Sequence, residues 1–173
     1  MIKNFKGKVV VITGGASGIG RGLAFSFAKR GMKVVLADID EENLVMVAKE
    51  LEEEFGTEVM TQITDVSDPE QVAHLAEVSY ERFGSVNILC NNAGVGGGGP
   101  VRHLTQENWN WTLGVNLFGV IYGIQHFLNR MLESKKPCHI VNTSSMARLV
   151  SGEQPYSASK FAVIAISESL ALE

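Results

Sequence analysis

Tyr156 and Lys160 stand four residues apart, in the segment Pro155-Tyr-Ser-Ala-Ser-Lys160. In a helix this spacing puts both side chains on one face, one turn apart. A nearby ammonium group favours the phenolate and lowers the pKa of the phenol from its reference value of about 10. A phenol with such a pKa exchanges a proton with a substrate oxygen near neutral pH. An exposed helical pair without a chemical role is the alternative, and the pair alone would favour it.

A glycine-rich turn lies near the other end of the chain, in Thr13-Gly-Gly-Ala-Ser-Gly-Ile-Gly20. It follows a β-branched run at 9–12 and opens a helical pattern, and Asp38 comes twenty residues after Gly18. Glycines allow backbone amides at a helix N-terminus to approach a pyrophosphate closely. The spacing differs from the common Gly-x-Gly-x-x-Gly motif but meets the same physical requirement. A strand-to-helix connection without a ligand is the alternative interpretation.

Apolar runs alternate with helical patterns along the whole chain. We predict strands at 9–12, 34–37, 59–63, 86–90 and 139–142. We predict helices at 19–30, 41–55, 69–83 and 106–132, and a last helix that starts near Pro155 and still continues at Glu173. This alternation, with buried strands, is typical of an α/β doubly wound parallel sheet of the Rossmann type, in the order 3-2-1-4-5. Residues 1–173 then form a single domain that carries all the motifs.

The chemically capable residues follow the ends of successive predicted strands. They are Gly14, Asp38, Asp65, Asn92 and Ser145, after the first to the fifth strand. In such sheets ligands bind outside the carboxyl ends of the strands, at the switch point between strands 1 and 4. We therefore predict one site at that edge, with the glycine run 96–99 as a mobile lip beside it.

Composition excludes several classes of function. The formal net charge is −4 and no basic cluster exists, so we expect no nucleic-acid partner. Cys90 and Cys138 are isolated and the four histidines lack ligand spacing, so we expect neither a disulfide nor a metal site. Because we find no apolar stretch long enough for a signal peptide or a membrane span, we expect no membrane partner and a cytoplasmic location.

Together these motifs resemble the classical short-chain dehydrogenase/reductase family. The features that match, in order, are the Thr13–Gly20 turn, Asn91-Asn-Ala-Gly94, Asn116, the serine after the fifth strand and Tyr156-x-x-x-Lys160. The resemblance implies a catalytic set of Asn116, Ser145, Tyr156 and Lys160. In this set Tyr156 is the acid/base on the substrate oxygen and Ser145 hydrogen-bonds that oxygen. Lys160 holds the nicotinamide ribose, and Asn116 anchors a water of the proton relay. For Ser144 a structural hydroxyl is expected.

The resemblance also implies hydride transfer between NAD(H) and a small alcohol or carbonyl substrate. The residues expected to bind the dinucleotide are Gly14, Ser17, Gly18, Ile19, Gly20, Asp38, Asp65, Val66, Asn92, Ala93, Gly94, Tyr156 and Lys160. We predict NAD(H) over NADP(H), because a carboxylate at Asp38 accepts hydrogen bonds from a ribose 2′-hydroxyl and repels a 2′-phosphate. Ser17 and Ile39 are neutral where phosphate-preferring relatives often carry a base, whereas Arg21 lies one position past the turn.

Members of the family normally continue for dozens of residues, with two further strands and a substrate-covering lid. We therefore expect the chain to be part of a longer enzyme, which leaves the fifth strand as an exposed edge. Arg148 stands where the family has a small residue, either to approach an acidic substrate group or as a solvated loop charge. A dehydratase or epimerase of the same fold and a truncated, non-catalytic nucleotide-binding module are the alternative functions.

The remaining expectations concern assembly. We interpret Trp109, Trp111, Phe118 and Phe127 as core or subunit contacts. The resemblance implies that the helices starting near Gln106 and Pro155 pair across a two-fold axis, which gives a homodimer or a homotetramer.

Overall fold

The computed structural model describes residues 2–96, 99–146 and 154–172. Arg148 lies outside these ranges, as do Gly97 and Gly98 of the glycine run, so the expectations for them stay predictions. Within the described ranges, five strands form one parallel sheet in the predicted order β3-β2-β1-β4-β5. They are β1 (Val9–Thr13), β2 (Lys33–Asp38), β3 (Val59–Ile63), β4 (Ile88–Asn91) and β5 (His139–Asn142).

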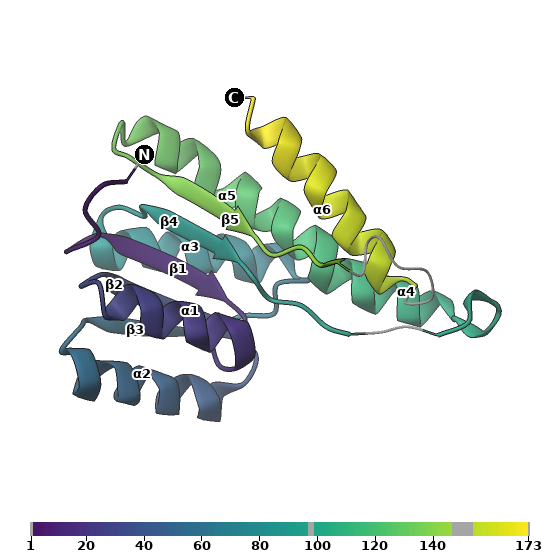
Figure 1. Cartoon of the computed structure of the whole chain (residues 1–173), viewed down its shortest axis with the longest axis horizontal. Helices are drawn as coiled ribbons and strands as arrows, with labels where there is room; N and C mark the ends of the chain where they lie inside the picture. Colours follow the sequence, from purple (N-terminus) through teal and green to yellow (C-terminus); the bar gives the residue numbers. More distant parts are fainter. Residues whose placement is uncertain (1, 97–98, 147–153, 173) are drawn as a thin grey trace.

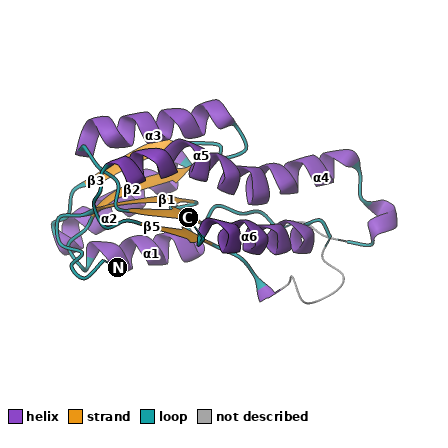
Figure 2. Cartoon of the chain, turned by 90° about the horizontal axis from the view of Figure 1, so that it is seen from above, coloured by secondary structure: helices purple, strands orange, loops and turns teal. Residues whose placement is uncertain are grey.

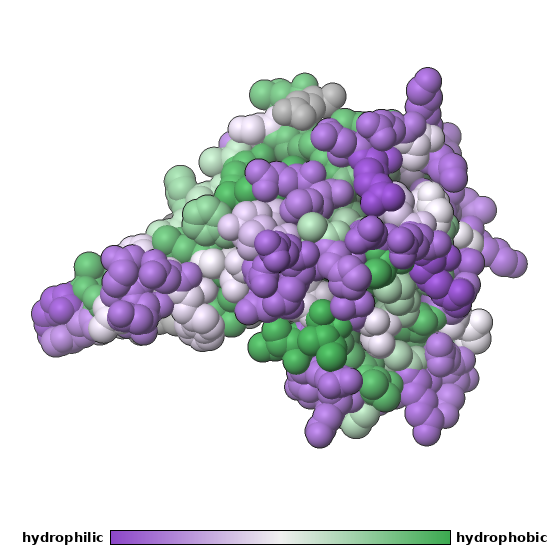
Figure 3. All heavy atoms as spheres, turned by 180° about the vertical axis from the view of Figure 1, so that it is seen from behind, coloured by the Kyte–Doolittle hydropathy of each residue, from purple (hydrophilic) through white to green (hydrophobic). Residues whose placement is uncertain are grey.

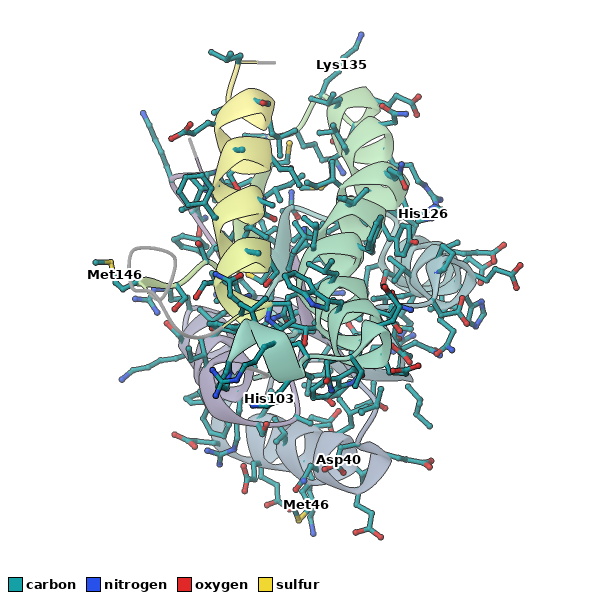
Figure 4. All side chains as sticks on the ribbon, turned by 90° about the vertical axis from the view of Figure 1, so that its right-hand side faces the viewer. Asp40, Met46, His103, His126, Lys135 and Met146 are labelled. Carbon is teal, nitrogen blue, oxygen red and sulfur yellow. The ribbon has the colours of Figure 1, made fainter. Side chains whose placement is uncertain are left out.

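Helices cover both faces of this sheet (Figures 1 and 2). On one face lie α1 (Gly18–Ala28) and α2 (Glu41–Phe55), and on the other lie α3 (Pro69–Phe83) and α5 (Gly119–Glu133). The short turn η1 (Val101–His103) and α4 (Gln106–Leu113) precede α5 and project beyond the sheet (Figure 3). The last helix, α6 (Tyr156–Leu170), runs beside α4 and α5 (Figure 4).

Alternate strand residues pack against the two helical layers, as expected for a sheet that is buried on both faces. Strand residues that pack with α1 and α2 are Val10, Ile12, Val34, Leu36, Ile88 and Cys90. Strand residues that pack with α3 and α5 are Val9, Val11, Val35, Ala37 and Leu89. Removal of these side chains from water is the main stabilising contribution to the fold.

Local signals explain where α2 and α3 begin and end. Asp40 and Asp68 are the N-caps, and their carboxylates accept hydrogen bonds from the first-turn amides of Asn43 and of Glu70. Gly56 and Gly84 end the two helices in the left-handed conformation, at φ 61° and 70°. Both helices therefore have the bounds that the sequence predicts.

The predicted continuous helix 106–132 was wrong in its middle. Residues Gly114–Phe118 form a π-helical turn, η2, between α4 and α5. A π turn inserts an extra residue into the helix and rotates the residues after it, and such turns are frequent at functional sites. Asn116 lies within this turn and is fully buried.

Several other boundaries differ from prediction by a few residues; for example, α1 ends at Ala28 and not at residue 30. β4 begins at Ile88, one residue after Asn87, whose backbone N–H donates to Val9 O and whose Oδ1 accepts a hydrogen bond from Val9 N. α6 ends at Leu170 and does not continue, since Leu172 N bonds to Ser169 O and tightens the last turn. Glu173 lies outside the described residues.

The predicted exposed edge at the fifth strand is confirmed among the described residues. There, β5 pairs only with β4, and its side chains are exposed or half-buried. Phe127 belongs to the core, as interpreted, whereas Trp111 is 54% exposed and Phe118 is also exposed. For these two side chains the subunit-contact interpretation stays open. No helix in the described part of the chain is long and apolar enough to cross a membrane.

The close packing of α5 on β4 gives a stability prediction. A Cβ at Gly123 would overlap Oδ1 of the buried Asn91 and lie 2.9 Å from its Cγ. Overpacking of this kind costs about 1–3 kcal/mol, so we expect Gly123→Ala to lower the free energy of unfolding by that amount. The control is Gly22→Ala at an exposed position of helix α1, where a Cβ meets nothing within 4 Å and should stabilise by about 0.5–1 kcal/mol. Urea unfolding followed by circular dichroism measures both, and equal effects would contradict the packing argument.

Candidate functional site at the carboxyl edge of the sheet

A cavity of about 720 Å³ opens at the carboxyl edge of the sheet. All the predicted site residues line it except Gly20 and Asn116. The structure thus brings together residues that are up to 146 positions apart in sequence, from Gly14 to Lys160. Ile39 and Gly96 also line the cavity. Further lining residues for which no site role was predicted are Thr64, Ser67, Val95, Trp111, Val115 and Thr143.

The glycine turn is a close contact between backbones. Gly14 has φ 66°, and a Cβ there would lie 2.8 Å from the Cα of Ala93. A Cβ at Gly20 would overlap the carbonyl oxygen of Gly14, which explains why Gly20 supports the turn without lining the cavity. Gly18 has φ 50° and open space beside it. The first two positions therefore shape the turn, and the third leaves room above it.

The N-terminus of α1 faces this open space. Ser17 is its N-cap residue, and the Ser17 side chain makes no capping hydrogen bond to the helix. Ser17, Gly18 and Ile19 all line the cavity. First-turn amides at a helix N-terminus carry partial positive charge and bind anions, phosphate groups among them.

Asp38 holds the end of β2 against the glycine turn. Its Oδ2 accepts a hydrogen bond from Ala16 N at 3.0 Å, and its Oδ1 accepts one from Ile39 N at 2.8 Å. The carboxylate also lines the cavity. Arg21 points elsewhere, because its guanidinium pairs with Glu50 at 2.6 Å and lies over the Phe25 ring at 4.5 Å. Arg21 is not among the cavity-lining residues.

Hydrogen bonds join the ends of β1, β4 and β5. Thr13 Oγ1 accepts from the backbone amides of Asn92 and Ala93, at 3.0 and 3.1 Å. Asn92 Nδ2 donates to Thr13 O at 3.0 Å, and Thr143 Oγ1 donates to Asn92 Oδ1 at 3.2 Å. Thr143 is a site residue that the sequence analysis missed, and its position directly after the fifth strand was the signal that could have identified it.

Lys160 continues this network into α6. Its side chain is buried, and Nζ donates to Thr143 O at 2.9 Å and lies 5.8 Å from the centroid of the Tyr156 ring. Burial lowers the pKa of Lys160 from its ordinary value. The two serines after β5 differ in placement. Ser145 lines the cavity, whereas Ser144 Oγ donates to Lys160 O at 2.9 Å and fastens α6 to the end of β5.

The side chain of Asn116 connects the loop after β4 to α6. Its Oδ1 accepts from Val95 N at 2.8 Å, and its Nδ2 donates to Val95 O at 3.0 Å and to Ser159 Oγ at 3.3 Å. Both amide hydrogens are thereby used, and the side chain does not line the cavity. The water-anchoring role expected for Asn116 therefore stays a prediction.

The edge as a whole combines a helix N-terminus, a carboxylate, a phenol and a buried ammonium group around one elongated cavity. These groups suit a ligand that is anionic in its middle and exchanges a proton at one end. Among the described residues, no three His, Cys, Asp or Glu side chains come together as metal ligands.

The buried Lys160 gives a pH prediction. The ordinary pKa of a lysine amine is 10.5, and that of Lys160 is lower in the folded state. At a pH between these two pKa values, the folded protein therefore binds fewer protons than the unfolded chain. Stability rises with pH wherever the unfolded state binds more protons. We therefore expect the free energy of unfolding of the wild type to rise relative to that of Lys160→Met as the pH is raised from neutrality to about 10.5. Urea titrations of both proteins across this range test it, and a falling or flat difference would contradict the burial of the charge.

Comparisons with known proteins agree with this fold and site. The chain matches the family model described as short chain dehydrogenase over residues 8–173. It is 35% identical over 174 residues to the CLA biosynthesis dehydrogenase/reductase of Lactiplantibacillus plantarum, in an alignment that covers 99% of this chain and 60% of that protein.

Solved structures of related proteins have the same fold as this chain. A short-chain dehydrogenase/reductase from Burkholderia phymatum, in complex with NAD, is 45% identical with a TM-score of 0.95, and the match covers 98% of this chain and 60% of that one. L-sorbose reductase from Gluconobacter frateurii, complexed with NADPH and L-sorbose, is 30% identical with a TM-score of 0.94, over 99% and 66% of the two chains. The chain spans about 60% of the length of the first two of these relatives. With the family model matching nearly all of its residues, the chain belongs to the short-chain dehydrogenase/reductase family.

Proposed function

We propose that the protein transfers a hydride between NAD(H) and a small alcohol or carbonyl substrate. The observation that carries this proposal is the meeting of Tyr156 and the buried Lys160 with the glycine turn and Asp38 around one cavity. When bound, the nicotinamide would supply the hydride donor or acceptor, and the protein would supply orientation and the proton.

The residues at the edge fit a dinucleotide. The α1 N-terminus has no side-chain cap and borders the cavity, so its amides are available to a pyrophosphate. The space beside Gly18 is open, and a side chain at position 18 would occupy it. Lys160 would hold the nicotinamide ribose, and Asn92, Ala93 and Gly94 would line the path between the two ends.

The chain's own residues would handle the proton. Tyr156 would give a proton to, or take one from, the substrate oxygen, and Ser145 would hydrogen-bond that oxygen. Lys160 Nζ, held by Thr143 O, keeps a positive charge near the Tyr156 ring. Asn116 would contribute by holding the Val95 loop against η2 and α6.

Two observations support NAD(H) over NADP(H). The carboxylate of Asp38 borders the cavity, where it would accept a hydrogen bond from a ribose 2′-hydroxyl and repel a 2′-phosphate. Arg21 is the nearest cation to the turn in sequence, and it is committed to Glu50 and Phe25. One relative is described with NAD and another with NADPH, so the choice rests on these residues.

Assembly as a homodimer or homotetramer and a cytoplasmic location stay predictions. Exposed Phe118 at the end of η2 and Phe161 on the neighbouring α6 support an interface over these helices.

The first functional prediction concerns the proton. In the full-length protein we expect Tyr156→Phe to lower turnover at least about 10²-fold, because the acidic hydroxyl is lost and the ring is kept. Dinucleotide affinity should change little. Lys160→Ala should weaken both, since it removes the ribose contact as well. Absorbance of the reduced nicotinamide over a panel of alcohols and ketones measures turnover, and fluorescence titration measures affinity. Wild type that binds NAD(H) without any turnover would indicate a non-catalytic nucleotide-binding module instead.

The second functional prediction concerns the cofactor. We expect tighter binding of NAD(H) than of NADP(H), and a preference reduced at least about tenfold in Asp38→Asn, which keeps an acceptor for Ala16 N and removes the charge. Arg21→Gln is the matched control, because an arginine paired with Glu50 contributes nothing to phosphate binding. Fluorescence titrations with both cofactors decide it. Tighter binding of NADP(H) than of NAD(H) by the wild type would refute the assignment. A loss of NADP(H) binding in Arg21→Gln would also refute it.

A further inference from the structure

Ser159 is a buried serine of α6 to which the proposed chemistry gives no role. It lies between Tyr156 and Lys160 in the sequence and is completely shielded from solvent. Its hydroxyl accepts a hydrogen bond from Asn116 Nδ2 at 3.3 Å and donates one to Tyr156 O at 2.6 Å. Ser159 therefore uses both its acceptor and its donor capacity on two different segments of the site.

The other end of this connection is firmly held. Asn116 grips Val95 through two hydrogen bonds, one to the amide and one from its own Nδ2 to the carbonyl. Val95 lies in the loop after β4 and lines the cavity. A continuous path of hydrogen bonds thus runs from the cavity wall at Val95, through Asn116 and Ser159, to the backbone of Tyr156.

The start of α6 depends on such a connection. Pro155 occupies its N-cap position and provides no side-chain cap. The most extensive contacts of α6 with other elements are those with η2 and α4, and not those with the strands. The first turn of α6 is therefore held on two sides. Ser144 Oγ and Thr143 O bond to Lys160 at the end of β5, and Asn116 of η2 bonds to Ser159.

We propose that Ser159 is a positioning residue that sets the place of Tyr156 by tying the first turn of α6 to Asn116. This inference rests on the proposed function for its effect on turnover, but the tie itself is independent of it. Removal of the hydroxyl leaves an amide hydrogen of Asn116 buried without a partner. The first turn of α6 then shifts, and misplacement of a reacting group by about 1 Å costs about 10²-fold in rate.

The same helix supplies a matched control. Ser157 is also buried, directly follows Tyr156, and its Oγ has no hydrogen-bond partner in the described structure. Ser157→Ala removes the same atom from the same helix without breaking a tie. A general sensitivity of α6 to serine loss would affect both positions, whereas positioning by Ser159 affects only one.

Kinetics of the full-length protein test the effect on turnover. We expect Ser159→Ala to lower kcat about 10- to 100-fold, with KM for the alcohol or ketone changed less than about threefold. Ser159→Thr, which keeps the hydroxyl, should recover most of the loss, and Ser157→Ala should stay within about twofold of wild type. In an Asn116→Ala background the loss caused by Ser159→Ala should largely disappear, because the tie is already broken. A kcat for Ser159→Ala within twofold of wild type, or equal losses at 157 and 159, would overturn the proposal.

A second measurement does not need turnover. The chain has three tyrosines, so incorporation of 3-fluorotyrosine gives a simple ¹⁹F NMR spectrum in which Tyr156→Phe identifies the Tyr156 signal. We expect this signal to move or broaden in Ser159→Ala and to keep its place in Ser157→Ala. If Ser159→Ala does not fold, the same spectrum is recorded for Ser159→Cys, which keeps the size and loses the strong hydrogen bonds. An unchanged Tyr156 signal overturns the positioning role. If the wild type shows no turnover but the Tyr156 signal still shifts in Ser159→Ala, the positioning role of Ser159 is upheld. Only the proposed function is then refuted.

Discussion

The hydrogen bonds among Thr13, Asn92 and Thr143 hold together the carboxyl ends of β1, β4 and β5, around which the candidate site is built. Parallel strands bring their carboxyl ends to one edge, but they leave the groups beyond the last ladder bond without partners. Here side chains satisfy those groups across β1, β4 and β5. Because Lys160 Nζ bonds to Thr143 O, the cation of α6 is placed by the same network as the glycine turn. A buried hydrogen-bond network of this kind is rigid, which is what a site of fixed geometry requires.

The π turn has a second, equally specific part in this arrangement. α5 packs closely because its glycines lack side chains. Gly119 lies against the side chain of Val66, and Gly123 lies against the side chain of Asn91 on β4. The wider turn η2 between α4 and α5 carries Asn116 inwards, where it joins the Val95 loop to Ser159. Regular α-helical geometry would place this side chain differently, so a local irregularity of the helix contributes directly to the site.

Function and stability make opposing demands at Lys160. A charged amine buried at the edge of the core is unfavourable to folding, as the lowered pKa shows. The hydrogen bond to Thr143 O offsets part of that cost. Exposed apolar side chains such as Trp111 and Phe118 are a similar case, since a surface optimised only for solubility would lack them. Residues that oppose local rules in this way are expected at functional or strained sites of a protein.

The order and kind of the elements could be predicted from the sequence, because periodicity and capping are local properties. The β-branched runs, Asp40 and Asp68 as caps, and Gly56 and Gly84 as stops each act within a few residues. The position of the site also followed from sequence, since parallel strands must bring the residues after each strand to one edge. The π turn, the hydrogen bonds of Asn116 to Val95 and the pairing of Arg21 with Glu50 are visible only in the folded structure. Each of these depends on a partner that is distant in sequence, and no local pattern records which distant group will lie within hydrogen-bonding distance.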